Sequence, residues 1–349
     1  MNKKLYNTFS KEDLIAKLIK QSEEYITISF YKYYKIFNPS WFRDYLYLEL
    51  DSIDVLGRIY LASEGINAQI AVPTKNLEKF KIKLNHISFL ENIHLNFALE
   101  NETKSFYILK IKIRNKIVAD GIDDPSFNSA ISGIHLNANE FNTITNNTAT
   151  IVVDMRNHYE SEIGHFENAI TPDVVTFRES LPIVLDQLKE FKESPIVMYC
   201  TGGIRCEKAS AYLKHHGFKD VYQLSGGIIN YAREVQEQGL NNKFIGKNFV
   251  FDERLGEKIS DEIISCCHQC GTLCDLHVNC SNDQCHILFI QCTSCSQKYQ
   301  NCCSKKCAEF NQLTPEHKSQ LKTQYEFNGS KFSKGRYKAL TKDTPLDLK

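Results

Sequence analysis

Residues 199–209 read Tyr199-Cys200-Thr201-Gly202-Gly203-Ile204-Arg205-Cys206-Glu207-Lys208-Ala209. The apolar run from Pro195 to Tyr199 predicts a buried strand that ends at Cys200. The segment from Arg205 to His216 is typical of a helix, so Cys200 falls in a strand-to-helix loop. Loops at the carboxyl ends of parallel strands are where α/β proteins place their ligands.

The composition of this loop suits an anionic sulfur. Two adjacent glycines allow unusual backbone dihedrals, so backbone N–H groups can turn inward at the start of the helix. A thiol in such a cradle has a lowered pKa and reacts as a thiolate, and an arginine adds a fixed positive charge. We therefore expect Cys200 and Arg205 to be catalytic and Thr201, Gly202, Gly203 and Ile204 to form the active-site loop.

Two alternatives remain open at this loop. A cysteine after a core strand can be buried and inert, although the glycines and Arg205 at this spacing argue against that interpretation. Cys206 could be a resolving thiol for Cys200. The favoured interpretation of Cys206 is a small residue that packs inside the start of the helix.

Outward from the loop, strands and helices alternate. Strands are predicted at Ile151–Val153, which Asp154 follows, and at Asp220–Leu224, with a helix at Pro182–Glu193. This order predicts a parallel α/β sheet. The corresponding domain is expected at 133–243.

The N-terminal part, 1–125, follows a different pattern. Strands are predicted at Tyr25–Ile36, Leu56–Leu61, Asn67–Val72 and Phe106–Val118, the last being a long final strand, and helices at Phe9–Gln21, Phe42–Leu50 and Thr74–Asn85. From Tyr25 onward the order is β-α-β-β-α-β, which predicts a ferredoxin-like (acylphosphatase-like) α+β domain. The whole chain is thus expected to be an α/β multidomain protein.

Eleven of the 13 cysteines lie between Cys266 and Cys307. Pairs of the C-x-x-C type can hold one tetrahedral metal ion from a tight turn, and so short a segment would need the ion in order to fold. Interleaved pairing predicts two structural zinc sites. The expected ligands are Cys267, Cys270, Cys292 and Cys295 in one site and Cys280, Cys285, Cys303 and Cys307 in the other. Cys302 is an alternative to Cys303 in the second site. An iron–sulfur cluster, reduced structural cysteines and disulfides are the alternatives. The domain is expected at 244–312, with a flexible basic tail at 313–349.

A basic strip is the candidate RNA contact. Leu109 to Arg114 alternates apolar and basic residues, so Lys110, Lys112, Arg114 and Lys116 would share one face of a strand. Tyr31 to Lys35 adds aromatic side chains on which bases could stack. The alternative is an ordinary solvated strand face with core tyrosines.

Composition sets outer bounds. Lys+Arg and Asp+Glu both number 42, so any basic surface must be local. The first 20 residues lack the apolar core of a signal peptide, and no stretch approaches the roughly 18 apolar residues of a membrane span. We therefore expect a cytoplasmic protein without a membrane partner.

The Cys200 loop resembles the C-x-x-G-x-R loop of rhodanese domains. Further likeness lies in Asp154-Met155-Arg156, Glu160, Gly164-His165-Phe166-Glu167-Asn168-Ala169 and Ser225-Gly226-Gly227. Phe166 and Asn168 replace residues that are commoner in that family. The resemblance implies a persulfide on Cys200, a loop closed by Arg205, and support from Asp154 and Arg156, whose alternative role is an ordinary structural ion pair.

The likeness extends over roughly Tyr25 to Cys307. The segments that carry it include Thr27–Tyr33, Glu64–Gln69, Ile117–Asp123, Asp154–Glu160, Cys200–Lys208 and Phe244–Arg254. These segments resemble the rhodanese-related tRNA uridine hydroxylase family (TrhO). That resemblance implies tRNA as partner and oxygen-dependent hydroxylation of the wobble uridine to 5-hydroxyuridine, with molecular oxygen as co-substrate.

The oxidant chemistry stays open. No flavin or nicotinamide fingerprint stands out, so the oxygen-activating cofactor is unidentified, and a sulfur or electron donor would be a further partner. Two other functions compete: a sulfurtransferase that passes sulfane sulfur from Cys200 to an acceptor, and a non-catalytic RNA-binding module. The two extra domains argue against a sulfurtransferase, and an intact Cys200 loop argues against a non-catalytic module.

Overall fold

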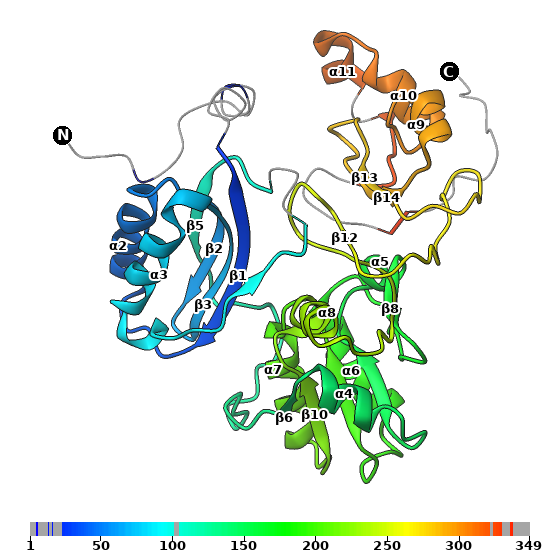
Figure 1. The fold of residues 1–349 in the computed structure, drawn as a ribbon. Helices are drawn as coiled ribbons and strands as arrows, with labels where there is room; N and C mark the ends of the chain where they lie inside the picture. Colours follow the sequence, from blue (N-terminus) through cyan, green and yellow to red (C-terminus); the bar gives the residue numbers. More distant parts are fainter. Residues whose placement is uncertain are drawn as a thin grey trace.

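The chain is described here by a computed structural model that covers residues 5, 13, 16, 23–100, 105–321, 324–329, 336 and 337. Three regions follow one another along the chain (Figure 1). The helix expected at Phe9–Gln21 falls almost entirely outside the described residues. No helix within the described ranges has both the length and the apolar character needed to cross a membrane.

The N-terminal region is one five-stranded sheet with helices on one face. Its elements are β1 (Tyr25–Tyr33), α2 (Pro39–Asp51), β2 (Leu56–Ala62), β3 (Gly65–Pro73), α3 (Leu77–Asn85), β4 (Asn96–Phe97) and β5 (Leu109–Ile113), with 3-10 turns at Thr74–Asn76 and Ser88–Leu90. The strand order is β4-β1-β3-β2-β5. β5 runs parallel to β2, and the other pairs are antiparallel.

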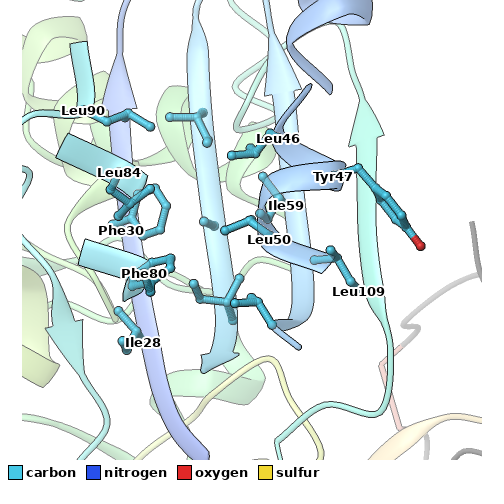
Figure 2. Close-up of a cluster of buried hydrophobic side chains, with 14 of the residues drawn as sticks. Ile28, Phe30, Leu46, Tyr47, Leu50, Ile59, Phe80, Leu84, Leu90 and Leu109 are labelled. Atoms are coloured by element: carbon cyan, nitrogen blue, oxygen red, sulfur yellow. The ribbon is translucent and has the colours of Figure 1, made fainter. Parts of the chain in front are cut away.

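The period of two along each strand separates an apolar face from a polar one. Ile28 and Phe30 of β1 pack with Ile59 of β2 against Leu46 of α2 and Phe80 of α3 (Figure 2). The residues between them in sequence point to the opposite face, which carries no helix of this region. That face is polar and includes Ser29, Tyr31, Arg58, Tyr60, Asn67 and Gln69.

The long final strand expected at Phe106–Val118 is wrong in length and in place. The strand there, β5, covers only Leu109–Ile113 and extends the sheet beyond β2. The sheet position next to β1 belongs instead to the two-residue strand β4, which the sequence pattern did not reveal. Two residues are too few to show an alternation of apolar and polar side chains.

The central region has a parallel sheet in the order β6-β10-β9-β7. Its elements are β6 (Ile134–Leu136), α4 (Ala138–Ile144), β7 (Ile151–Asp154), α5 (His158–Ser161), β8 (Gly164–Phe166), α6 (Phe177–Gln187), β9 (Ile196–Tyr199), α7 (Ile204–His215), β10 (Val221–Leu224) and α8 (Gly227–Gln238). Helices cover both faces, because one core packs β9 against α6 and α7 and another packs it against α4 and α8. The predicted α/β architecture is confirmed.

The helix expected at Pro182–Glu193 begins five residues earlier, at Phe177. Its start is set by a capping box, in which Thr176 and Glu179 satisfy each other's backbone N–H groups. Pro182 therefore lies inside α6 rather than at its first turn.

The C-terminal region is joined to the central one through strand pairing. β11 (Phe244–Asn248) pairs with β8 and with β12 (Glu257–Lys258). The remaining elements are β13 (His277–Asn279), β14 (Leu288–Ile290), α9 (Thr293–Tyr299), α10 (Lys305–Asn311) and α11 (Pro315–Leu321).

Several residues of the expected basic tail pack onto the body of the protein. Tyr337 stacks on Phe289 and on His268, and Phe327 contacts Phe310. Arg336 forms an exposed ion pair with Asp173. The composition of the tail indicated a flexible segment, whereas these side chains contact the body of the protein.

Candidate active site

Cys200 lies directly after β9, the strand between β7 and β10 in the parallel sheet. Gly203 has φ +94°, and a Cβ at this position would come within 2.9 Å of the Tyr31 hydroxyl. Gly227, with φ +67°, lets the start of α8 approach so closely that a Cβ would lie 2.4 Å from the Cys200 carbonyl. The Ile228 N–H donates to that same carbonyl at 3.0 Å. The glycines thus allow two helix N-termini to meet around one residue.

The loop holds the Cys200 sulfur as a thiolate. Burial raises the pKa of this thiol, but the hydrogen bond from Cys206, the charge of Arg205 and the N–H groups of Arg205 and Gly203 outweigh burial and bring the pKa down to about 6. The Gly203 N–H lies 3.2 Å from the Cys200 Sγ atom. The expected anion cradle is therefore present around this sulfur.

Cys206 is buried in the first turn of α7 and hydrogen-bonds to Cys200. Burial and the neighbouring Cys200 sulfur raise the pKa of Cys206 well above its ordinary value. Cys206 thus stays protonated and acts as a donor to the Cys200 thiolate. This geometry agrees with packing at the helix start, and it adds a hydrogen-bonding role.

Arg205 is fixed by a buried carboxylate. Its Nη1 and Nη2 atoms donate to Oε1 and Oε2 of Glu160 at 2.7 and 2.8 Å, and Nη2 also lies 3.3 Å from the Thr201 hydroxyl. Burial raises the pKa of Glu160, but Arg205 more than offsets this and holds it below its ordinary value. Such a bidentate pair fixes the guanidinium in one orientation beside the loop.

Asp154 and Arg156 form a second buried pair at the end of β7. The Arg156 Nη2 atom lies 2.6 Å from Asp154 Oδ2 and 2.6 Å from the Gly164 carbonyl, and the guanidinium lies over the Tyr199 ring. Both side chains are fully buried. They contact the strand that leads into the loop, and no contact with the Cys200 sulfur is present.

A cavity of about 310 Å³ lies between the Cys200 loop and the polar face of the N-terminal sheet. Cys200, Thr201, Gly202, Ile204 and Arg205 line one side of it. The other side is made by side chains of β1, β2 and β3, including Ser29, Tyr31, Arg58, Tyr60, Asn67 and Gln69. The volume is at the lower end of the range of small-ligand sites.

Side-chain contacts hold this polar face against the central region. The Tyr31 hydroxyl donates to Glu207 at 2.9 Å, and Lys208 forms a 2.6 Å ion pair with Glu64. Asn96 reaches the Gly202 carbonyl at 3.4 Å, and Arg233 of α8 donates to the Phe97 carbonyl at 2.9 Å. Glu207 and Lys208 follow the reactive loop directly, so this loop and the N-terminal sheet are positioned together.

The basic strip continues the sheet face that lines the cavity. Lys110 and Lys112 of β5 stand opposite Arg58 and Tyr60 of β2, and opposed residues project from the same face of a sheet. Arg114 follows β5 with its guanidinium over the Tyr60 ring. Lys116 does not join the strip, because it pairs with Asp120 at 2.5 Å.

Eight cysteine sulfurs come together in two groups. Cys267, Cys270, Cys292 and Cys295 form one group, and Cys280, Cys285, Cys303 and Cys307 form the other, each with all four sulfurs within 4.8 Å of one another. Cys266, Cys274 and Cys302 stay outside both groups. The grouping is interleaved along the chain, as the spacing predicted.

Several residues around the cavity escaped the sequence reasoning as site residues. Glu160 was noted only as part of a family pattern, and its role as the partner of Arg205 depends on a contact across 45 positions. Asn67 and Gln69 belong to the strand predicted at Asn67–Val72, in which polar and apolar residues alternate from Asn67 to Ile70. That alternation also identifies the polar face to which they belong, and this was the available signal.

Comparison with known proteins assigns all three regions. Residues 25–117 match the UPF0176 acylphosphatase like domain, 137–234 the Rhodanese-like domain and 245–308 the Rhodanase C-terminal domain. Proteins named tRNA uridine(34) hydroxylase are 53% identical in Pectobacterium carotovorum (334 residues, 95% of this chain and 94% of the relative) and 52% identical in Photorhabdus laumondii (336 residues, 96% and 95%). A Yersinia pestis protein of the same name is 53% identical over 335 residues, 95% of this chain and 94% of its own. Because these relatives are 52–53% identical over at least 95% of its length, the chain belongs to the tRNA uridine(34) hydroxylase family.

Proposed function

We propose that this enzyme hydroxylates uridine 34 of tRNA to 5-hydroxyuridine and that Cys200 is its nucleophile. The observation that carries the proposal is the position of the Cys200 thiolate. It lies in a cavity whose opposite side is the polar face of a second domain, with cationic side chains continuing along that face. A small-molecule sulfurtransferase would not need that second wall.

The chemistry follows from a thiolate next to a pyrimidine. Addition of the Cys200 sulfur to C6 of uracil moves the ring electrons toward O4 and makes C5 nucleophilic. C5 then takes a hydroxyl group from an oxygen-derived electrophile, and loss of the C5 proton with departure of Cys200 restores the ring. With molecular oxygen as the source, a donor must supply two electrons and two protons to reduce the second oxygen atom to water.

The residues around Cys200 support these steps. Arg205, the Gly203 N–H and Cys206 hold negative charge on the sulfur before attack and after departure. Preorganised donors of this kind contribute most when charge moves during the reaction. Because tRNA is the substrate, the proposal includes a cytoplasmic location.

The same proposal gives Lys110, Lys112 and Arg114 the role of phosphate contacts. They extend the wall of the cavity, and Arg58 at that wall has no ion pair within the described ranges. A cationic path from the cavity along β5 would position the anticodon backbone while one base enters the cavity.

The two cysteine groups fit zinc. A tetrahedral site with Zn–S bonds of about 2.3 Å has sulfurs roughly 3.8 Å apart. Sulfur–sulfur distances are 3.6 Å for Cys270–Cys292, 3.7 Å for Cys285–Cys303 and 3.6 Å for Cys303–Cys307. We assign these ions a structural role, because neither group lies at the cavity that contains Cys200.

Nucleoside mass spectrometry of tRNA tests the proposal. A strain without this gene should lack the 5-hydroxyuridine that the full-length chain supplies at position 34, and the plasmid-borne gene should restore it. Restoration of a thiolated nucleoside instead would show sulfur transfer. An unchanged nucleoside profile in both strains would contradict the proposed function.

A further inference from the structure

Two amide side chains lie side by side on the sheet face that lines the cavity. Asn67 and Gln69 belong to the central strand β3, two residues apart, so both project toward the Cys200 side. Asn67 Nδ2 donates to the Ile117 carbonyl at 3.2 Å, and Gln69 Nε2 approaches Asn67 Oδ1 at 3.5 Å.

This chain of contacts fixes the orientation of the Gln69 amide. The Ile117 carbonyl can only accept, so Asn67 must turn its nitrogen there and its oxygen toward Gln69. Gln69 in turn must present its nitrogen to Asn67. A reversed Gln69 amide would bring two acceptor oxygens together.

The remaining groups of Gln69 point to a ligand. Its Oε1 atom has no hydrogen-bond partner in the described part of the chain, and its Nε2 atom keeps a second hydrogen. Gln69 is half-buried and lines the cavity. The cavity therefore offers one acceptor next to one donor, in a fixed order.

We propose that Gln69 selects uracil by pairing with its N3–H and O4 groups, an inference that rests on the function proposed above. Uracil presents a donor at N3 beside an acceptor at O4, which complements Oε1 and Nε2. Cytosine presents the reverse order, an acceptor at N3 beside an amino donor. Gln69 can match cytosine only by breaking its contact with Asn67.

The geometry of the ring agrees with this assignment. N3 and C6 lie on opposite sides of a pyrimidine. A base held by its N3 edge at the sheet wall directs C6 toward the opposite wall, which the Cys200 loop forms. One contact would thus both identify the base and present the atom that the thiolate attacks.

Binding of anticodon stem-loops that differ only at position 34 tests the inference. The purified full chain should bind the uridine form about 10- to 100-fold more tightly than the 3-methyluridine or cytidine forms, the range expected for one bidentate contact. Gln69→Leu should bind all three forms equally. Asn67→Ala should bind cytidine more tightly than wild type does, because Gln69 can then reverse, while 3-methyluridine stays excluded.

The control is Gln238→Leu, the same change at an exposed position of α8 outside the cavity, which should keep the full uridine preference. A Gln69→Leu protein that still prefers uridine, or a wild-type chain without preference, would overturn the inference. Nucleoside analysis in cells separates the two claims. If wild type makes 5-hydroxyuridine but the preference does not depend on Gln69, only the inference fails; if wild type makes none, the proposed function fails.

Discussion

At the residue scale, Cys200 and Cys206 show how the surroundings of a buried thiol set its pKa. Both thiols are fully buried, and burial by itself raises the pKa of a thiol. Cys200 receives hydrogen bonds and faces the Arg205 charge, so its pKa falls to about 6. Cys206 donates to it and stays protonated. The two thiols therefore differ in their partners: Cys200 accepts several hydrogen bonds beside Arg205, and Cys206 gives one of them.

The titration of Cys200 follows from this arrangement. A folded-state pKa below the ordinary value means that the thiolate is fully present well above pH 6 and is lost as pH falls through about 6. The thiolate absorbance of wild type minus that of Cys200→Ser should show this midpoint, and turnover should fall on the same acid limb. A titration midpoint near pH 9, the ordinary value for a thiol, would contradict the claim that the loop stabilises the Cys200 thiolate.

The charge of Arg205 is tested by Arg205→Lys. A lysine keeps the charge but lacks the planar pair of nitrogens that each donate to one Glu160 oxygen, so the side chain no longer holds the loop in a fixed geometry. Turnover should fall by about 10²- to 10³-fold, as for loss of one preorganised donor. The Cys200 pKa should rise in the same variant.

The melting temperature of Arg205→Lys should also fall, because Glu160 is buried and loses one partner. A lysine variant with wild-type turnover and an unchanged Cys200 pKa would mean that Arg205 only stabilises the fold. Glu160→Gln provides the matched comparison from the other side of the pair.

At the element scale, the two groups of four cysteines supply much of the core of the cysteine-rich region. Cys267 and Cys295 belong to the apolar cluster around Phe249, and Cys285 and Cys303 belong to that around Phe289. Pairs of strands as short as β13 and β14 are barely stable alone. The free energy of metal binding would therefore supply much of the free energy that folds this region.

Elemental analysis should find about two zinc ions per chain, one for each group of four thiolates. A chelator strong enough to remove them should lower the melting temperature and expose the thiols to alkylation. Cys270→Ser should lose one ion, whereas Cys266→Ser, an exposed cysteine outside both groups, should keep both. Folded protein without metal would contradict the assignment.

The sequence predicted elements well where a signal was local and strong. β9, α7 and the Cys200 loop follow from an apolar run, two glycines and a helical pattern within some 20 residues. Cysteine spacing predicted the grouping of the eight thiols but left Cys302 and Cys303 open, because spacing does not show which of two neighbouring side chains points toward the other three sulfurs. The short strand β4 and the Arg205–Glu160 pair depend on contacts between distant segments, which no local pattern carries.

At the scale of the whole molecule, the cavity exists because two domains share it. The N-terminal sheet turns its polar face to the Cys200 loop, and Glu207 and Lys208, directly after that loop, bind Tyr31 and Glu64 of the N-terminal domain. In Figure 1, α2 and α3 lie on the face of this sheet that is turned away from the central region. The central domain supplies the Cys200 loop. The N-terminal domain supplies polar side chains and the basic strip.

Reversing the charge of the basic strip should weaken tRNA binding. Changing Lys110, Lys112 and Arg114 to Glu should lower affinity at low salt, and the slope of log affinity against log salt should become shallower by about 2 to 3 for three lost phosphate contacts. The control reverses three exposed lysines elsewhere, Lys79, Lys192 and Lys219, which gives the same net charge. Equal affinities for the two variants would place the RNA on another face.

The central claim is that the Cys200 sulfur performs the hydroxylation, and the most direct test is Cys200→Ser in a strain that lacks the chromosomal gene. The measurement is the 5-hydroxyuridine content of position 34 in purified tRNA, with Cys266→Ser as the matched control. We expect Cys200→Ser to fall to the level of the deletion strain with an unchanged fold by circular dichroism, and Cys266→Ser to match wild type. A folded Cys200→Ser protein that restores 5-hydroxyuridine would contradict the account.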